Sequence, residues 1–188
     1  MTFDLFASSS PSADEAQLIS LPGAELLFFP CFFSSVESDA YLAALTNDIH
    51  WQQENITLYG QTHPVPRLTA WYGDTNSRYT YSGISANALP WNDTLLSIKQ
   101  GIEEKTDGKT FNSVLLNLYR NGADGVAWHS DDEAELGSTP VIGSVTFRQE
   151  RPFQLRHRHD KSLKYSLSLP HGSFLLMRGD TQKEWLHQ

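Results

Sequence analysis

The chain has 188 residues and a mass of 21.2 kDa, enough for one domain with an ordinary apolar core but not for two domains of normal size. Apolar residues make up 39% and charged residues 19%, and no apolar run is long enough to span a bilayer. From the short apolar runs we expect no membrane partner. A single cysteine excludes a disulfide or a thiolate cluster within the chain. We therefore expect a reducing, intracellular compartment, which is the cytoplasm or, in a eukaryote, the nucleus.

The N-terminal residues differ in composition from the rest of the chain. Residues 1–23 are rich in Ser, Ala and Pro and predict a flexible arm, whereas residues 24–188 predict a single domain. A short buried strand is expected at residues 24–29. Cys31 follows an apolar run, which predicts a small buried side chain.

Two helices are expected before residue 108. Ser34 and Glu37 form a capping-box pattern that begins a helix ending near Ile49. Four residues share the side that we expect to be buried: Val36, Ala40, Ala43 and Ala44. A second helix begins near Asn92 or Asp93, and three apolar residues at helical spacing mark it: Leu95, Ile98 and Ile102.

Short strands separated by Gly, Pro, Asn or Asp follow Gly108. They are expected at residues 111–119, 140–147, 151–158, 162–169, 172–178 and 183–187. Helices first and strands later predict an α+β fold, with an antiparallel sandwich or barrel in the C-terminal part.

The net charge of −8 is unevenly distributed. Residues 1–66 contain eight acidic residues and no Lys or Arg, whereas residues 67–188 balance to zero. Between Arg148 and Lys164 the local net charge is +4. This stretch is either the solvated face of a strand or a strip that follows a phosphate backbone, with Arg156 and Arg158 as the expected contacts.

The segment Trp128-His129-Ser130-Asp131-Asp132-Glu133 is the most informative part of the sequence. In an extended chain His129 and Asp131 point to one face and could ligate one metal ion. Alone, the pattern also fits an acidic surface turn. Four histidines could supply a third ligand: His157, His159, His171 and His187. We favour His187, which closes a late strand, because His157 and His159 lie in the basic stretch and His171 lies in a predicted turn. Two histidines and one carboxylate would leave open positions for a cosubstrate and dioxygen at Fe(II).

Several segments together resemble the AlkB family of Fe(II)/2-oxoglutarate-dependent dioxygenases, and most closely the branch of human AlkB homologues two and three. The matching segments, in the family's order, are residues 66–73, 79–82, 111–121, 128–133, 171–173 and 185–187. The resemblance implies a double-stranded β-helix, or jelly roll, with the N-terminal helices packed on one sheet.

The resemblance also implies roles for individual residues. It implies an iron site, which is the catalytic centre, made by His129, Asp131 and His187. It implies that Asn117 and Tyr119 bind 2-oxoglutarate, although the pair could also be polar residues on a solvated strand. It implies five residues at the substrate base, with core packing or a solvated turn as the alternatives: Trp71, Tyr79, Tyr81, Asp132 and Glu133.

The implied activity is oxidative demethylation of N-alkylated bases, of the 1-methyladenine and 3-methylcytosine kind, in DNA or RNA. We expect a monomeric repair enzyme that prefers single strands. The alternatives are a dioxygenase of the same fold with another substrate and a catalytically impaired nucleic-acid-binding module. Two departures from the family matter here. The given sequence stops at Gln188, before the family's Arg-x-Asn-x-Thr-x-Arg strand whose arginine anchors 2-oxoglutarate, so we expect either a fragment or a defective enzyme. In addition, Arg148 replaces a glycine common in the family.

Overall fold

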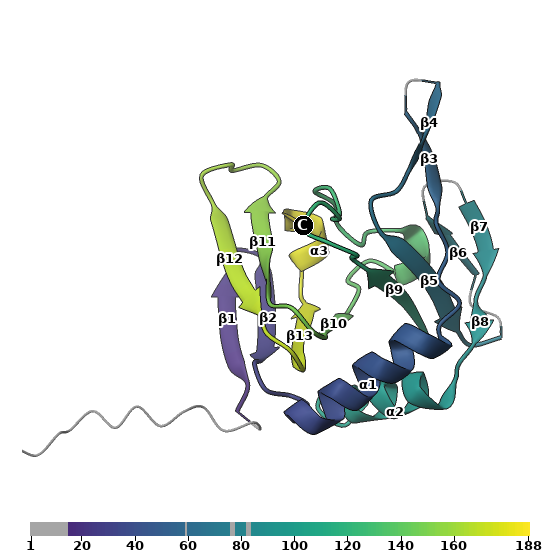
Figure 1. Cartoon of the computed structure of the whole chain (residues 1–188). Helices are drawn as coiled ribbons and strands as arrows, with labels where there is room; N and C mark the ends of the chain where they lie inside the picture. Colours follow the sequence, from purple (N-terminus) through teal and green to yellow (C-terminus); the bar gives the residue numbers. More distant parts are fainter. Residues whose placement is uncertain (1–14, 59, 76–77, 82–83) are drawn as a thin grey trace, which may run out of the picture.

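The computed structural model describes residues 15–58, 60–75, 78–81 and 84–188. Its main sheet has four antiparallel strands, in the order β1 (Gln17–Leu21), β2 (Ala24–Phe29), β13 (Ser173–Arg178) and β10 (Ile142–Thr146). A second antiparallel sheet has the order β12 (Lys164–Leu169), β11 (Arg151–His157) and β14 (Trp185–His187). Figure 1 shows the two sheets side by side at one end of the molecule.

The main sheet is buried on both faces, which explains the continuous apolar sequence of β13. Alternate residues of a strand point to opposite faces. Leu175 and Met177 belong to a core cluster with Leu155 and Trp185 of the second sheet, whereas the alternate residues of β13 belong to a different cluster with the helices. The main sheet is therefore the middle of three layers, and each large apolar side chain buried there contributes about 1.5–3 kcal/mol.

The two long helices cover the other face of the main sheet. The helix α1 (Ser35–Asp48) begins with the predicted capping box, in which the Ser34 side chain accepts from the Glu37 N–H and Glu37 accepts from the Ser34 N–H. The helix α2 (Asp93–Glu103) is capped by Asn92, and its three predicted apolar residues are buried. Both predictions are confirmed because capping and spacing are local signals.

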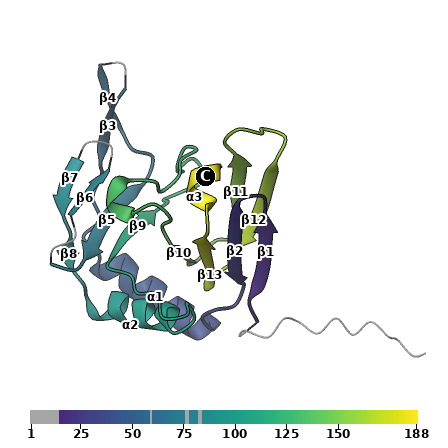
Figure 2. The same ribbon diagram turned by 180° about the vertical axis from the view of Figure 1, so that it is seen from behind.

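The remaining strands lie at the opposite end of the molecule, as both views show (Figures 1 and 2). A three-stranded sheet has the order β8 (Leu89–Pro90), β5 (Leu68–Gly73) and β9 (Ser113–Leu118). Two hairpins accompany it, β3 (Asn55–Leu58) with β4 (Gln61–Pro64) and β6 (Arg78–Tyr81) with β7 (Ile84–Asn87). Two short helical segments complete the description, the 3₁₀ helix η1 (Ala134–Leu136) and α3 (Thr181–Glu184).

The expected buried side of α1 is wrong. Val36 is 77% exposed, and Ala40 and Ala43 are also exposed. The helix instead buries Ser38, which lies against Gly172, and it turns Tyr41 and Leu45 toward the core. A Cβ at Gly172 would lie 2.3 Å from the Ser38 hydroxyl. The close approach of a turn, which the helix sequence does not encode, thus decides which side faces inward.

Three further expectations differ from the structure. Cys31 is exposed, so the prediction of a buried thiol is wrong; it lies in the turn that follows β2. The expected flexible arm is wrong for residues 17–21, because they pair with β2 as the edge strand β1, and residues 1–14 lie outside the described part of the chain. The last expected strand is two residues too long at its start, because Lys183 and Glu184 belong to α3.

The observed architecture is mostly β with helices on one side, as the α+β prediction requires. Among the residues that the structure describes, all strand pairs are antiparallel except β5 with β8. Within the described residues no helix is long and apolar enough to cross a membrane.

Candidate metal centre

Backbone hydrogen bonds bring together two histidines that are far apart in sequence. The His129 N–H donates to the His187 carbonyl over 3.0 Å, and the His187 N–H donates to the His129 carbonyl over 2.7 Å. The imidazole ring centroids are 4.2 Å apart. On its other side β14 pairs with β11, where Leu155 lies opposite His187. Sheet pairing therefore fixes the position of His187.

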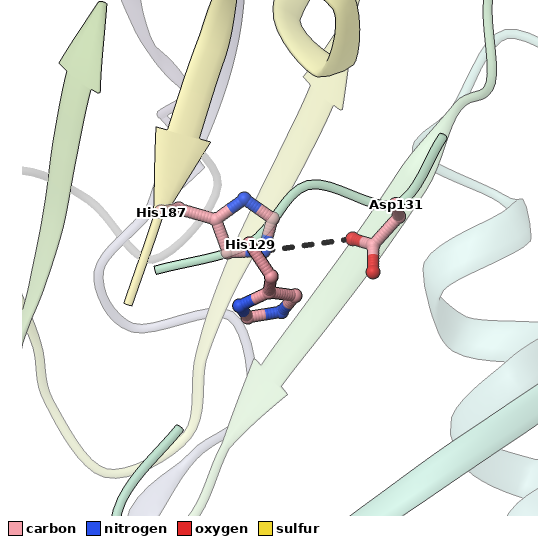
Figure 3. Close-up of side chains that lie close together, drawn as sticks. All are labelled: His129, Asp131 and His187. Carbon is pink, nitrogen blue, oxygen red and sulfur yellow. Dashed lines mark ion pairs between the residues drawn. The ribbon is translucent and has the colours of Figure 1, made fainter. Parts of the chain in front are cut away.

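Asp131 completes the cluster from the extended segment after His129. Its Oδ2 atom lies 3.6 Å from His187 Nε2, a contact marked by the dashed line in Figure 3. The backbone N–H of Asp131 donates to Gln182 Oε1 over 3.0 Å. The potential ligand atoms of the two histidines and the aspartate all lie within 4.8 Å of one another. The three residues predicted as metal ligands are thus brought together.

The orientation of His129 suits metal binding. Its Nδ1 atom lies 2.8 Å from the Ala127 carbonyl oxygen. A carbonyl only accepts, so Nδ1 carries the proton and the lone pair is on Nε2. The Phe153 ring packs against the ring of His187, and the two ring centroids are 5.2 Å apart.

Burial changes the proton affinity of two members of the cluster. The buried position of His187, with a smaller effect of nearby His129, lowers its pKa to about 3, so the imidazole is neutral at physiological pH. Burial also raises the pKa of Asp131; neighbouring Glu133 and Asp132 act in the same direction and His129 opposes them. Both shifts express the cost of a buried charge, and a bound divalent cation would offset that cost for the carboxylate.

This donor set fits Fe(II). Two neutral imidazoles and one carboxylate form the facial set that leaves coordination positions open on a non-haem iron. The three remaining candidate histidines make other contacts. The ring centroid of His159 lies 6.0 Å from that of His157. His157 Nδ1 accepts from the Asp160 N–H over 3.0 Å, and His171 Nδ1 accepts from the Arg148 N–H over 2.8 Å.

The two residues predicted to bind 2-oxoglutarate lie on and just after β9, outside the ligand cluster. Asn117 is exposed and pairs in register with Thr69 of β5. Tyr119 is half-buried, and the Arg151 guanidinium lies 4.5 Å from the centroid of its ring. Arg151 is held in place by a 2.7 Å hydrogen bond to the Asp124 carbonyl.

The residues predicted to face the substrate base are distributed over three elements. Trp71 is half-buried on β5, and Tyr79 and Tyr81 lie on β6, with side chains outside the described part of the structure. Asp132 is exposed and its Oδ2 atom lies 2.5 Å from Arg158 Nη2, whereas half-buried Glu133 precedes η1. Asp132 and Glu133 follow the ligand cluster directly, while the other three come from the opposite end of the fold.

Sequence reasoning missed the residues that support the cluster. Gln182, only 1% exposed, accepts from the backbone of Asp131, and nothing in the sequence of α3 indicates this. The basic stretch was expected to be a solvated face or a phosphate strip. Arg151, Arg156 and Arg158 instead make contacts within the chain. In an extended segment successive side chains point to opposite faces, so Trp128, Ser130 and Asp132 point away from His129 and Asp131. That pattern could have indicated that these three side chains contact another part of the chain.

Comparison with known proteins is consistent with this geometry. The model of the 2OG-Fe(II) oxygenase superfamily matches residues 25–188. The human alpha-ketoglutarate-dependent dioxygenase alkB homolog 3 is 41% identical over 169 residues, covering 85% of this chain and 58% of its own length. Two further relatives are named DNA oxidative demethylase ALKBH2. The Arabidopsis thaliana protein is 34% identical, and the match covers 95% of this chain and 65% of the relative. The Mus musculus protein is 33% identical, and the match covers 85% of this chain and 70% of the relative.

The chain belongs to the AlkB family within the 2OG-Fe(II) oxygenase superfamily. This confirms the resemblance found in the sequence, and it implies Fe(II) and 2-oxoglutarate as the cofactor and cosubstrate of the fold. The chain spans less than two thirds of the length of the alkB homolog 3 proteins that it matches.

Proposed function

We propose that this chain carries the catalytic domain of an oxidative demethylase that repairs N-alkylated bases in nucleic acid. The observation that carries the proposal is the cluster of His129, Asp131 and His187 in a member of this family. The names of the relatives, an alpha-ketoglutarate-dependent dioxygenase and DNA oxidative demethylases, support the reaction and the substrate class.

The three clustered residues would hold Fe(II), His129 through Nε2 and Asp131 through its carboxylate. Bound there with 2-oxoglutarate and dioxygen, Fe(II) would supply the oxidation of an N-methyl group to a hydroxymethyl group, with succinate and carbon dioxide as the coproducts. The hydroxymethyl group would then leave the base as formaldehyde. The protein's own contribution would be to present two imidazoles and a carboxylate to one side of the ion, so that its other positions are free for cosubstrate and dioxygen. The lowered pKa of His187 supports this, because a protonated imidazole cannot ligate a metal.

Asn117 and Tyr119 would bind 2-oxoglutarate by hydrogen bonds from the amide and the phenol. The contact of Arg151 with the Tyr119 ring supports this role, because it fixes the ring and places a cation beside it. A carboxylate cosubstrate is favoured near such a cation.

Five residues would form the base-binding surface: Trp71, Tyr79, Tyr81, Asp132 and Glu133. Aromatic stacking contributes about 1–3 kcal/mol for each base, and an unpaired base avoids the cost of leaving a duplex. We therefore propose 1-methyladenine and 3-methylcytosine in single-stranded DNA or RNA as substrates. Because Arg151, Arg156 and Arg158 are engaged within the chain, exposed Lys161 and Lys164 are the better candidates for phosphate contacts.

The finer features of the fold and the setting are also part of the proposal. We propose that the two facing sheets form a double-stranded β-helix and that residues 24–188 are one dioxygenase domain. We also propose that the protein acts as a monomer inside the cell, in the nucleus if the organism is a eukaryote. The core cluster shared by both sheets supports the first two points.

The test is turnover of oligonucleotides that carry 1-methyladenine or 3-methylcytosine by the full-length protein with Fe(II), 2-oxoglutarate and ascorbate. We expect formaldehyde and succinate in equal amounts, faster turnover of single strands than of duplexes, and no turnover by the Asp131→Ala variant. Succinate formation with another substrate class alone would favour a different dioxygenase. Oligonucleotide binding without any succinate would indicate an impaired binding module.

A further inference from the structure

The segment that carries two of the proposed metal ligands is contacted by Arg156 of β11 and by Arg158, which directly follows that strand. Along residues 128–132 the side chains alternate, and His129 and Asp131 face the ligand cluster. The even-numbered residues face the other way. The Arg156 guanidinium lies 4.3 Å from the centroid of the Trp128 ring, and Arg158 Nη2 donates to both the Ser130 hydroxyl and the Asp132 carboxylate.

Arg158 also contacts the short helix that leads to the third proposed ligand. Its Nη2 atom lies 3.3 Å from the Gln182 carbonyl oxygen, and its backbone N–H donates to the Glu184 carbonyl over 2.8 Å. The side chain of Gln182 accepts from the Asp131 N–H. Arg158 thus joins β11, the segment with His129 and Asp131, and the helix α3 that precedes His187.

We propose that Arg158 is a positioning residue of the metal centre, which holds the segment 129–132 and α3 in the relative placement that metal binding requires. The inference rests on the proposed role of the His129, Asp131 and His187 cluster. It assigns Arg158 a structural task at the metal centre in place of the phosphate contact expected from sequence.

The physical reason is preorganisation. Residues 130–133 form neither helix nor strand, so backbone pairing does not fix them beyond the bridge at His129. Groups that orient metal ligands typically change metal affinity about 10–100-fold when they are removed.

The experiment is anaerobic titration of the full-length protein with Mn(II), followed by electron paramagnetic resonance, in wild type and in Arg158→Ala. We expect affinity to fall about tenfold or more. Lys183→Ala is the matched control, because Lys183 is an exposed cation of α3 whose partner, Asp180, is also exposed. Its Mn(II) affinity should stay within about twofold of wild type.

Two measurements separate positioning from general folding. The absorption bands of the Co(II)-loaded protein report ligand geometry, and they should change in Arg158→Ala but not in Lys183→Ala. Arg158→Lys keeps the charge but loses the fork of donors, so its affinity should lie between those of wild type and Arg158→Ala. If Arg158→Ala does not fold, Ser130→Ala, which removes one acceptor, should still weaken Mn(II) binding measurably.

The outcomes distinguish this inference from the proposed function. Wild-type Mn(II) affinity and an unchanged Co(II) spectrum in Arg158→Ala, or in Ser130→Ala if that variant is used, would overturn the positioning role alone. Loss of Mn(II) binding by Arg158→Ala with a normal melting temperature would support it. Absence of Mn(II) binding by the wild-type protein would instead overturn the proposed metal centre.

Discussion

The metal-bearing region, residues 127–188, differs in how its strands are supported from the hairpin region, which consists of the two hairpins at residues 55–64 and 78–87. Every strand of the metal-bearing region pairs within a sheet of at least three strands, and β13 is buried at five of its six positions. The hairpins β3–β4 and β6–β7 pair only as two-stranded sheets, and β4 is exposed throughout. Figure 1 shows β3 and β4 projecting from the body of the molecule.

The difference matches the tasks that we propose for the two regions. A metal centre needs ligand atoms held to a fraction of an ångström, and sheet pairing together with the Arg158 contacts provides this. A surface that admits an extracted base has to move, and elements of low local stability are suited to that. Two-stranded hairpins are marginally stable on their own.

The largest expected effect follows from truncating the middle layer of the metal-bearing region. Phe174 is 0% exposed and its ring stacks on Phe29 at 5.7 Å. Phe174→Ala should destabilise the protein by about 3–5 kcal/mol, measured by urea unfolding. Val36→Ala, at an exposed position, should change stability by less than about 0.5 kcal/mol. Similar losses in both variants would contradict the assignment of the core.

Folding stability should depend on pH through His187, a buried histidine of the metal-bearing region. Because the pKa of His187 is lowered to about 3 in the folded metal-free protein, the unfolded chain binds the proton first as pH falls below about 6.5. Folding stability should therefore decrease by about 1 kcal/mol between pH 7.5 and pH 5.5 on account of this residue. The raised pKa of Asp131 acts in the opposite direction, so His187→Asn is needed for comparison. Equal pH slopes in the two proteins would refute the prediction.

Shortening the first hairpin tests whether the hairpin region is independent. Asn55 and Pro64 pair directly, so a two-residue turn can replace residues 56–63. The hydrogen bond from the Val65 N–H to the Glu54 carbonyl, 2.9 Å long, would keep the base closed. We expect a stability change below about 1 kcal/mol and unaltered Mn(II) affinity. A large loss of either would show that the two regions depend on each other.

The smallest expected effect concerns Arg148, between β10 and β11. Its φ of 78° lies in the left-handed region, which costs a side chain about 1 kcal/mol and costs glycine nothing. Arg148→Gly should relieve this strain, but glycine also gives the unfolded chain more freedom, which offsets part of the gain. We therefore expect a net rise in stability of about 0.5 kcal/mol. The hydrogen bond from its N–H to His171 would remain. A lower melting temperature would show that the arginine side chain makes a compensating contact.

Local signals in the sequence predicted local structure well. The capping box of Ser34 and Glu37 and the cap at Asn92 were found because they depend on residues three positions apart. The spacing of His129 and Asp131, with a late strand for His187, was enough to propose the cluster that the structure brings together. The α+β class followed from the order of helices and strands.

Features that depend on distant contacts could not be predicted in the same way. Which side of α1 is buried depends on the close approach of Gly172 to Ser38. The contacts of Arg158 depend on the register of β11 with β14 and on the path of residues 130–132. A run of basic residues has the same appearance in sequence whether it faces solvent or holds a neighbouring segment. In the structure Arg156 and Arg158 contact Trp128, Ser130 and Asp132, and the phosphate contacts expected of these arginines stay a prediction.

The most direct test of the account is an anaerobic titration of the full-length protein and its Asp131→Ala variant with Fe(II) or Mn(II). Removing one anionic ligand of three should abolish stoichiometric binding, whereas the wild-type protein should bind one ion per chain. Asp180→Ala, which removes an exposed carboxylate of the same charge, serves as the control and should bind as the wild type does. Unchanged metal affinity in Asp131→Ala would contradict the assignment of the metal centre.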